Sequence, residues 1–178
     1  MPEAIVNDLK AAGDEFMGVL SSFSQQQINI SSNADCWTAA QVGDHLLKAH
    51  SFVLGVVCGK SEKSERAQDQ KAPEIKRIFL DFSVKFKAAE AIVPSDDRLE
   101  KENLLAALKT KFEPLYEAAS TLDLSETCLK SEFPFMGTLT SYEWFYFVCS
   151  HTERHIYQLK NILQRTAENK SLLSQTIS

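Results

Sequence analysis

The chain has 178 residues, of which 44% are hydrophobic and 24% charged, so it is long enough for one domain with a substantial core and is not of a disordered type. Proteins that bind nucleic acids usually have a basic surface that contacts the phosphates. The net charge here is -5, so we expect no nucleic-acid partner. The N-terminus lacks the features of a signal peptide and no run of about 18 apolar residues could span a bilayer, so we expect a cytoplasmic protein with no membrane association. The four cysteines form no CxxC pair and are expected to be free thiols.

Apolar residues at steps of three and four predict the first helix over residues 3–24. A second helix is predicted to start just after Trp37, because Thr38 and Gln41 have the spacing of a capping box. It runs up to the charged stretch GKSEKSERAQDQKAP. This stretch is almost free of apolar residues, so we predict an exposed connection that the core does not need.

Residues 74–93 contain apolar positions that do not lie on one helical face, and we predict a short helix, or a helix followed by a loop. Asp97 and Glu100 again have capping-box spacing, so a third long helix is expected to follow them. Pro114 lies within that helix and is expected to kink it or to disturb its hydrogen bonding locally. The stretch FPFMGTLT then interrupts helicity.

The last long helix is predicted to begin near Thr140, which has capping-box spacing with Glu143. Its periodicity is lost after Arg165, so we interpret residues 1–165 as a single domain and residues 166–178 as a C-terminal tail that frays or packs loosely. Four long amphipathic helices, some joined by longer connections, predict an all-α protein that folds as a four-helix bundle.

Three of the four histidines are predicted to converge. His151 and His155 lie on the apolar stripe of the last helix, about 40° apart around its axis and about 6 Å apart along it. His45 lies on the inward stripe of the second helix, whereas His50 is rotated from it by about 140° and should point elsewhere. Three buried neutral imidazoles need hydrogen-bond partners, and one divalent cation would satisfy all three together. The ordinary alternative for an HxxxH pair is two structurally hydrogen-bonded residues.

Two motifs resemble the DinB/YfiT-like superfamily. WTAAQVGDHLLKAH is similar to the start of a helix in that family, and FPFMGTLTSYEWFYFVCSHTERHIYQL is similar to its final helix. The resemblance implies a four-helix bundle with long crossover connections, a homodimer, and a divalent metal held by three histidines, which fall here on His45, His151 and His155. Imidazole ligands suit several metals, and we expect zinc or nickel, with iron as an alternative.

Three histidine ligands would leave coordination positions open, as in catalytic zinc sites. A bound water would become a hydroxide nucleophile, which predicts a metal-dependent hydrolase. A bound low-molecular-weight thiol would instead be deprotonated, which predicts a thiol S-transferase of the kind that the resembled superfamily includes. The third interpretation is a non-catalytic metal-binding stress-response protein. The sequence indicates no general acid or base.

Arg154 and Gln158 are candidates for ordering the histidines or a neighbouring helix, and of the two only Gln158 supplies an acceptor for an imidazole N–H. We interpret Glu153 and Asp44 as exposed charges and Glu143 as a capping residue.

The last helix also carries apolar residues away from its histidine stripe, more than one bundle face needs, so we expect a symmetric homodimer to cover them. These residues are Tyr142, Phe145, Tyr146, Cys149 and Tyr157. Trp37 and Trp144 are interpreted as packing residues.

Overall fold

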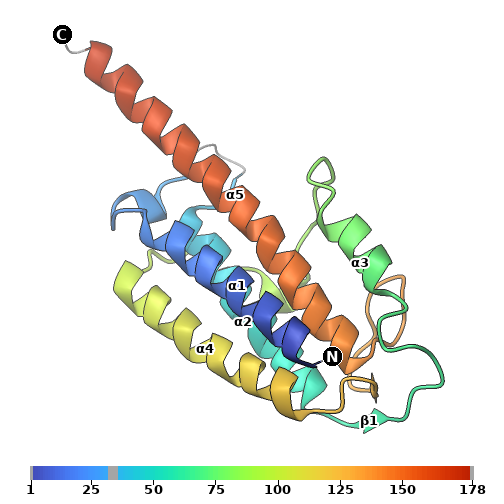
Figure 1. Ribbon diagram of the computed structural model, residues 1–178. Helices are drawn as coiled ribbons and strands as arrows, with labels where there is room; N and C mark the ends of the chain where they lie inside the picture. The colour runs from blue at the N-terminus through green and yellow to red at the C-terminus, as the bar shows by residue number, and fades with distance from the viewer. Residues whose placement is uncertain (1, 32–35, 177–178) are drawn as a thin grey trace.

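The computed structural model describes residues 2–31 and 36–176 and shows an all-α bundle of four long helices, which confirms the predicted fold class (Figure 1). The long helices are α1 (Pro2–Ser21), α2 (Ala39–Val57), α4 (Lys101–Thr121) and α5 (Ser141–Thr176). The shorter elements are η1 (Gln27–Asn29), α3 (Ala72–Phe79) and η2 (Glu90–Ile92), with the antiparallel strands β1 (Ser61–Glu62) and β2 (Thr127–Cys128). Within the described residues, no helix combines the length and apolar character needed to cross a membrane.

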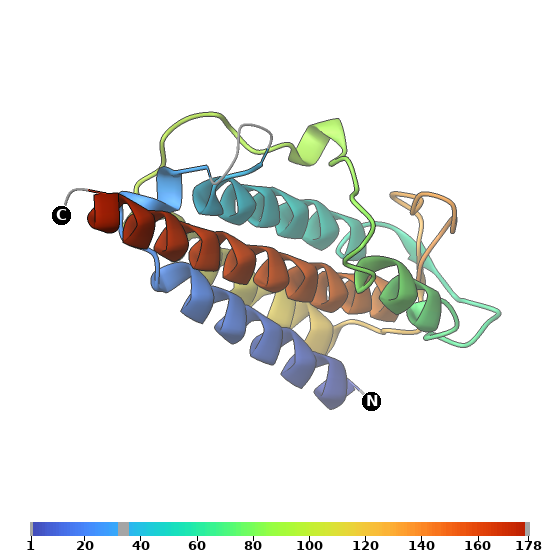
Figure 2. The ribbon, with the colours of Figure 1, turned by 90° about the horizontal axis from the view of Figure 1, so that it is seen from above.

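The four long helices pack as neighbours around the bundle in the order α1, α5, α2, α4. The connection between α2 and α4 is long and lies outside the bundle, where α3 packs on α5 and η2 packs on α2 (Figure 2). Because α2 and α5 are adjacent, their inward faces share one part of the core. The histidines of the two helices lie on these faces.

The predicted capping box at the start of α2 is present. Thr38 Oγ1 accepts from the Gln41 N–H at 3.1 Å, and Gln41 Oε1 accepts from the Thr38 N–H at 3.0 Å. From its spacing with His45, Phe52 was expected on the inward stripe of α2, but it is 45% exposed, and Val53 is buried instead. His45 lies on the buried side, as expected.

The start of α4 is not capped as predicted. Asp97 and Glu100 form no capping box, and Glu100 is itself the N-cap residue without a side-chain hydrogen bond. The N–H of Lys101 instead donates to Gln25 Oε1 at 2.7 Å, from the connection between α1 and α2. The helix continues through Pro114.

The charged connection over residues 59–73 does more than face solvent, which corrects the sequence interpretation. Arg66 donates to both carboxylate oxygens of the fully buried Glu143, each at 2.6 Å, and the backbone N–H of Lys71 donates to the same carboxylate at 2.7 Å. Glu143 also forms the predicted capping box with Thr140. The connection therefore fixes the start of α5.

The last helix is longer than expected. α5 continues to Thr176, so the helix does not end near Arg165, and its C-terminal part extends beyond the other helices (Figure 1). Successive turns on one face of this helix carry the histidine pair.

The surface proposed for a dimer is smaller than the sequence suggested. Phe145 and Cys149 are buried within the chain, because α1 packs on that side of α5. Tyr142 and Tyr146 are half-buried, and only Tyr157 is well exposed. The homodimer stays a prediction with less apolar surface to support it. All four cysteines are free, as expected.

Candidate metal centre

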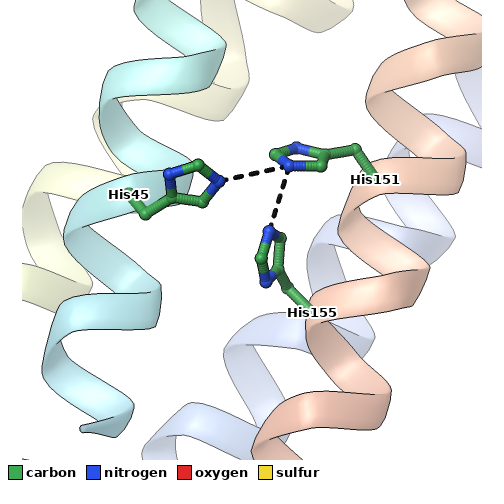
Figure 3. A group of neighbouring side chains, drawn as sticks. All are labelled: His45, His151 and His155. Carbon is green, nitrogen blue, oxygen red and sulfur yellow. Dashed lines mark hydrogen bonds between the residues drawn. The ribbon is translucent and has the colours of Figure 1, made fainter. Parts of the chain in front are cut away.

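His45 from α2 and His151 and His155 from α5 point toward one another between the two helices (Figure 3). Nε2 of His151 lies 3.2 Å from Nε2 of His45 and 3.0 Å from Nε2 of His155. The ring nitrogens available as ligands, one from each residue, all lie within 4.8 Å of one another. The predicted convergence is therefore present in the structure, and all three side chains are buried.

Two of the three rings are held from behind by oxygen acceptors. Nδ1 of His45 lies 2.7 Å from the backbone carbonyl oxygen of Ile92, and Nδ1 of His155 lies 2.8 Å from Oε1 of Gln158. A carbonyl oxygen only accepts, so each Nδ1 carries the hydrogen and each Nε2 presents a lone pair to the cluster. Gln158 has the acceptor role that the sequence suggested. Ile92 carries no sequence signal, since its contribution is a backbone atom.

Burial sets the charge of the cluster. It lowers the pKa of His45, and the hydrogen bond to Ile92 only partly opposes this effect. Burial and the neighbouring histidines lower the pKa of His151 well below its usual value and that of His155 to about 3. All three imidazoles are thus neutral at pH 7, which is the form that binds metals.

Aromatic rings adjoin the cluster at opposite ends. The ring of Trp37 lies 4.9 Å from that of His45 and 6.5 Å from that of His155. The ring of Phe79, at the end of α3, lies 5.8 Å from that of His151. Trp37 was interpreted from the sequence as a packing residue only, and its position beside two of the histidines was missed.

The fourth histidine lies outside the cluster, as predicted. His50 is buried, with Nε2 3.3 Å from Oγ1 of Thr152 and its ring 4.9 Å from that of Phe112. Its Nδ1 is buried and has no hydrogen-bond partner among the described residues. Burial lowers the pKa of His50 to about 3, so this side chain is neutral as well.

Of the three charged residues near the cluster, one is exposed and two make contacts within the chain. Glu153 is exposed, as expected. Asp44 was expected to be exposed, but its side chain is only 14% exposed: it accepts from the Ser95 N–H at 2.8 Å and pairs with Lys48 at 2.9 Å. The connection that follows η2 folds over α2 and covers this carboxylate. Arg154 binds the end of α3, the neighbouring-helix role that the sequence suggested.

Two cavities of the described structure lie away from the histidines. One of about 130 Å³ lies at the start of α2 and is lined in part by Gln41 and Asp96. The other, a groove of about 540 Å³ between α2 and α4, is lined in part by Leu54, Cys58 and Pro114. Neither of these two cavities is lined by a histidine of the cluster, whose three side chains are buried.

Comparisons with known proteins show the family to which this chain belongs. The uncharacterized protein YuaE of Bacillus subtilis (strain 168) is 26% identical over 150 residues, which cover 82% of this chain and 89% of that protein. The structure of TT2238, described as a four-helix bundle protein, matches with a TM-score of 0.58 and 16% identity and covers 90% of this chain and 99% of its own.

The structure of YfiT from Bacillus subtilis matches with a TM-score of 0.60 and 13% identity, covering 93% of this chain and 87% of its own. It is described as a probable metal-dependent hydrolase with an unusual four-helix bundle topology. At such low identity, these two structures support the fold alone. The model of the DinB superfamily matches residues 8–159, which is most of the chain. The chain therefore belongs to the DinB superfamily.

Proposed function

We propose that this protein binds a divalent metal ion, zinc, nickel or iron, through Nε2 of His45, His151 and His155, and that it is a metal-dependent hydrolase. The observation that carries the proposal is the convergence of three neutral imidazole nitrogens in the interior. Membership of the DinB superfamily and the description of YfiT as a probable metal-dependent hydrolase agree with it.

The hydrogens available within the cluster favour an ion. The Nδ1 hydrogen bonds leave lone pairs on Nε2 of His45 and His155, and both lone pairs face Nε2 of His151. A neutral His151 has one N–H, so at most one of the two short contacts can be a hydrogen bond. The other contact leaves a buried lone pair facing a nitrogen that offers it no hydrogen. A cation would accept a lone pair from each ring and remove this conflict.

The spacing of the nitrogens also suits an ion. In a tetrahedral site with Zn–N distances of about 2.0–2.1 Å, two ligand nitrogens lie about 3.3–3.4 Å apart. Two of the three contacts in the cluster, at 3.2 Å and 3.0 Å, are close to this value, and the third pair of nitrogens lies within 4.8 Å.

The number of ligands favours a catalytic site over a structural one. Within the described residues, no cysteine, aspartate or glutamate joins the three histidines. Three protein ligands are typical of catalytic zinc, and an ion held by these histidines would supply a nucleophile, since a coordinated water can have its pKa lowered to about 7. Ile92 and Gln158 would hold two of the ligand rings in place and increase their basicity.

Metal content tests the binding step. We expect about one ion per chain in protein purified without added metal, or after reconstitution with zinc, nickel or iron. His45→Ala, His151→Ala and His155→Ala should each lose the ion, because two ligands remain. His50→Ala is the control and should keep it. Equal loss of metal from His50→Ala and His155→Ala would contradict the site.

Turnover by the metal-loaded protein tests the chemistry. Hydrolysis of ester or amide probes without any thiol, and its loss on chelation, supports the hydrolase. Product that forms only when a low-molecular-weight thiol and an electrophile are both present would contradict the hydrolase and support the S-transferase. Stoichiometric metal with neither activity would favour a non-catalytic metal-binding protein.

A further inference from the structure

The residues that cover the histidine cluster decide how an ion or a substrate reaches the proposed metal site. This inference therefore rests on the proposed function. His45, His151 and His155 expose only 3%, 6% and 6% of their surfaces. An ion can exchange, and a substrate can approach it, only if part of the surrounding wall moves. The helices α2 and α5 form the bundle itself, so the movable part must be a connection.

One connection contacts both sides of the cluster. Residues 80–93, which we call the strap, run from the end of α3 through η2. Phe79, the residue before the strap, has its ring 5.8 Å from that of His151. Ile92, near the other end of the strap, accepts the hydrogen bond from His45. The strap therefore links the His151 side of the cluster to the His45 side.

Few hydrogen bonds join residues of the strap to one another. Apart from η2 it forms turns and irregular backbone, and the described backbone hydrogen bonds within it are local ones, such as Val84 N–H to Asp81 O at 3.4 Å. Phe82, Val84 and Phe86 are 43%, 42% and 49% exposed. Segments with exposed side chains and few buried contacts open more readily than the helices around them.

Arg154 on α5 fastens the strap to the bundle. Its guanidinium donates to the backbone oxygens of Phe79 at 3.1 Å and Asp81 at 2.9 Å, and also to that of Val84. The same group lies over the ring of Phe86, 4.7 Å from its centroid. One side chain thus holds two carbonyl groups and one aromatic ring in the first half of the strap, together with the carbonyl group of Phe79 just before it.

A second attachment comes from the same part of α5. The ring of Tyr157 stacks on that of Phe82 with centroids 4.2 Å apart and planes at 15°. Arg154 and Tyr157 flank the ligand candidate His155 in the sequence, so the strap is fastened at the level of the cluster.

We infer that the strap is a movable cover of the metal centre and that Arg154 provides the main attachment that holds its first half closed. Arg154 touches neither the histidines nor a reacting group in this arrangement, so it is a positioning residue. Release of its hydrogen bonds frees the end of the strap next to Phe79 and opens a path to the cluster. The rate at which the bound ion exchanges then depends on Arg154.

The test uses the full chain loaded with Zn²⁺, mixed with an excess of a chromogenic chelator, with the rate of zinc transfer as the readout. Arg154→Met keeps the aliphatic stem and removes all three hydrogen bonds, so we expect transfer at least about tenfold faster than in the wild type. Phe82→Ala removes the ring that stacks on Tyr157. Because Phe82 is 43% exposed, the variant should fold, and it should give a smaller increase in the transfer rate. Arg165→Met, which changes an exposed arginine further along α5, is the matched control and should leave the rate unchanged.

Hydrogen exchange separates opening of the strap from general destabilisation. In Arg154→Met, the amides of residues 81–93 should exchange faster, while those of α2 and α5 near the histidines keep the wild-type rates. Equal zinc-transfer rates in Arg154→Met and wild type, or equally faster exchange throughout α2 and α5, would overturn the inference about the strap alone. A wild-type chain that binds none of zinc, nickel and iron would overturn the proposed function and the role of the strap with it.

Discussion

Two buried polar clusters lie along α5, and their hydrogen bonding differs. Near the start of the helix, the carboxylate of Glu143 accepts from Arg66 and from the backbone N–H groups of Lys71 and Thr140. Two helical turns further on, the nitrogens of the histidine cluster face one another with at most one hydrogen between them. The first cluster is complete within the chain, and the second is not.

This difference separates a structural role from a binding role. Buried polar groups in folded proteins are nearly always hydrogen-bonded, and an exception calls for an explanation such as a bound ion. Glu143 needs no such explanation, because every donor around it belongs to the chain. The histidine cluster does need one, because its facing nitrogens have at most one hydrogen between them. Substitutions in the two clusters should therefore affect different properties of the protein.

The largest effect on folding is expected at the complete cluster. Glu143→Ala removes the partner of Arg66, whose side chain is only 22% exposed, and of two backbone N–H groups. Breaking a buried pair in this way costs about 3–5 kcal/mol of the free energy of unfolding. Denaturant unfolding of the metal-free protein measures the loss. Glu74→Ala breaks the exposed pair with Arg77 and should change stability little; an equal loss in both variants would contradict the structural role of Glu143.

The local part of both clusters was predictable from the sequence. The capping box between Thr140 and Glu143 spans three residues, and His151 and His155 are four residues apart, so helical geometry alone places each pair. His45 required one further step, the assumption that its helix packs beside the last one.

The long-range part was not predictable, because it depends on where the connections fold. Arg66 reaches Glu143 across 77 positions of sequence, and Ile92 reaches His45 across 47. The failed capping box at Glu100 has the same origin, since Gln25 supplies the acceptor for the start of α4 from 76 positions away. No periodicity or spacing in the sequence records these contacts.

A smaller effect is expected at His50, which is buried and neutral but lies outside both clusters. Its pKa is about 3 when folded and about 6.5 when unfolded, so the unfolded chain binds more protons between these values. The stability that depends on neutral His50 is fully present above about pH 6.5 and is lost as the pH falls toward 3, at up to about 1.4 kcal/mol per pH unit.

His50→Leu should remove this contribution. Between pH 7 and pH 5 the variant should lose about 2 kcal/mol less of its free energy of unfolding than the wild type does. Chemical denaturation at the two pH values measures the difference. Parallel losses in both proteins would show that His50 is not the group that titrates.

The smallest effect, and the one that bears most directly on the incomplete cluster, is expected at Gln158. Its Oε1 is the acceptor for Nδ1 of His155, so it fixes which nitrogen of that ring faces the cluster. Gln158→Leu removes the acceptor and should weaken metal binding about tenfold, the lower end of what such outer contacts contribute, without changing the fold. Gln158→Glu retains an acceptor and should bind at least as tightly as the wild type, while Gln70→Leu, at an exposed position outside the site, should leave affinity unchanged. Competition with a chelator of known affinity measures all three. Unaltered affinity in Gln158→Leu would mean that His155 does not present Nε2 to an ion, and the ligand set would have to be redrawn around the other two histidines.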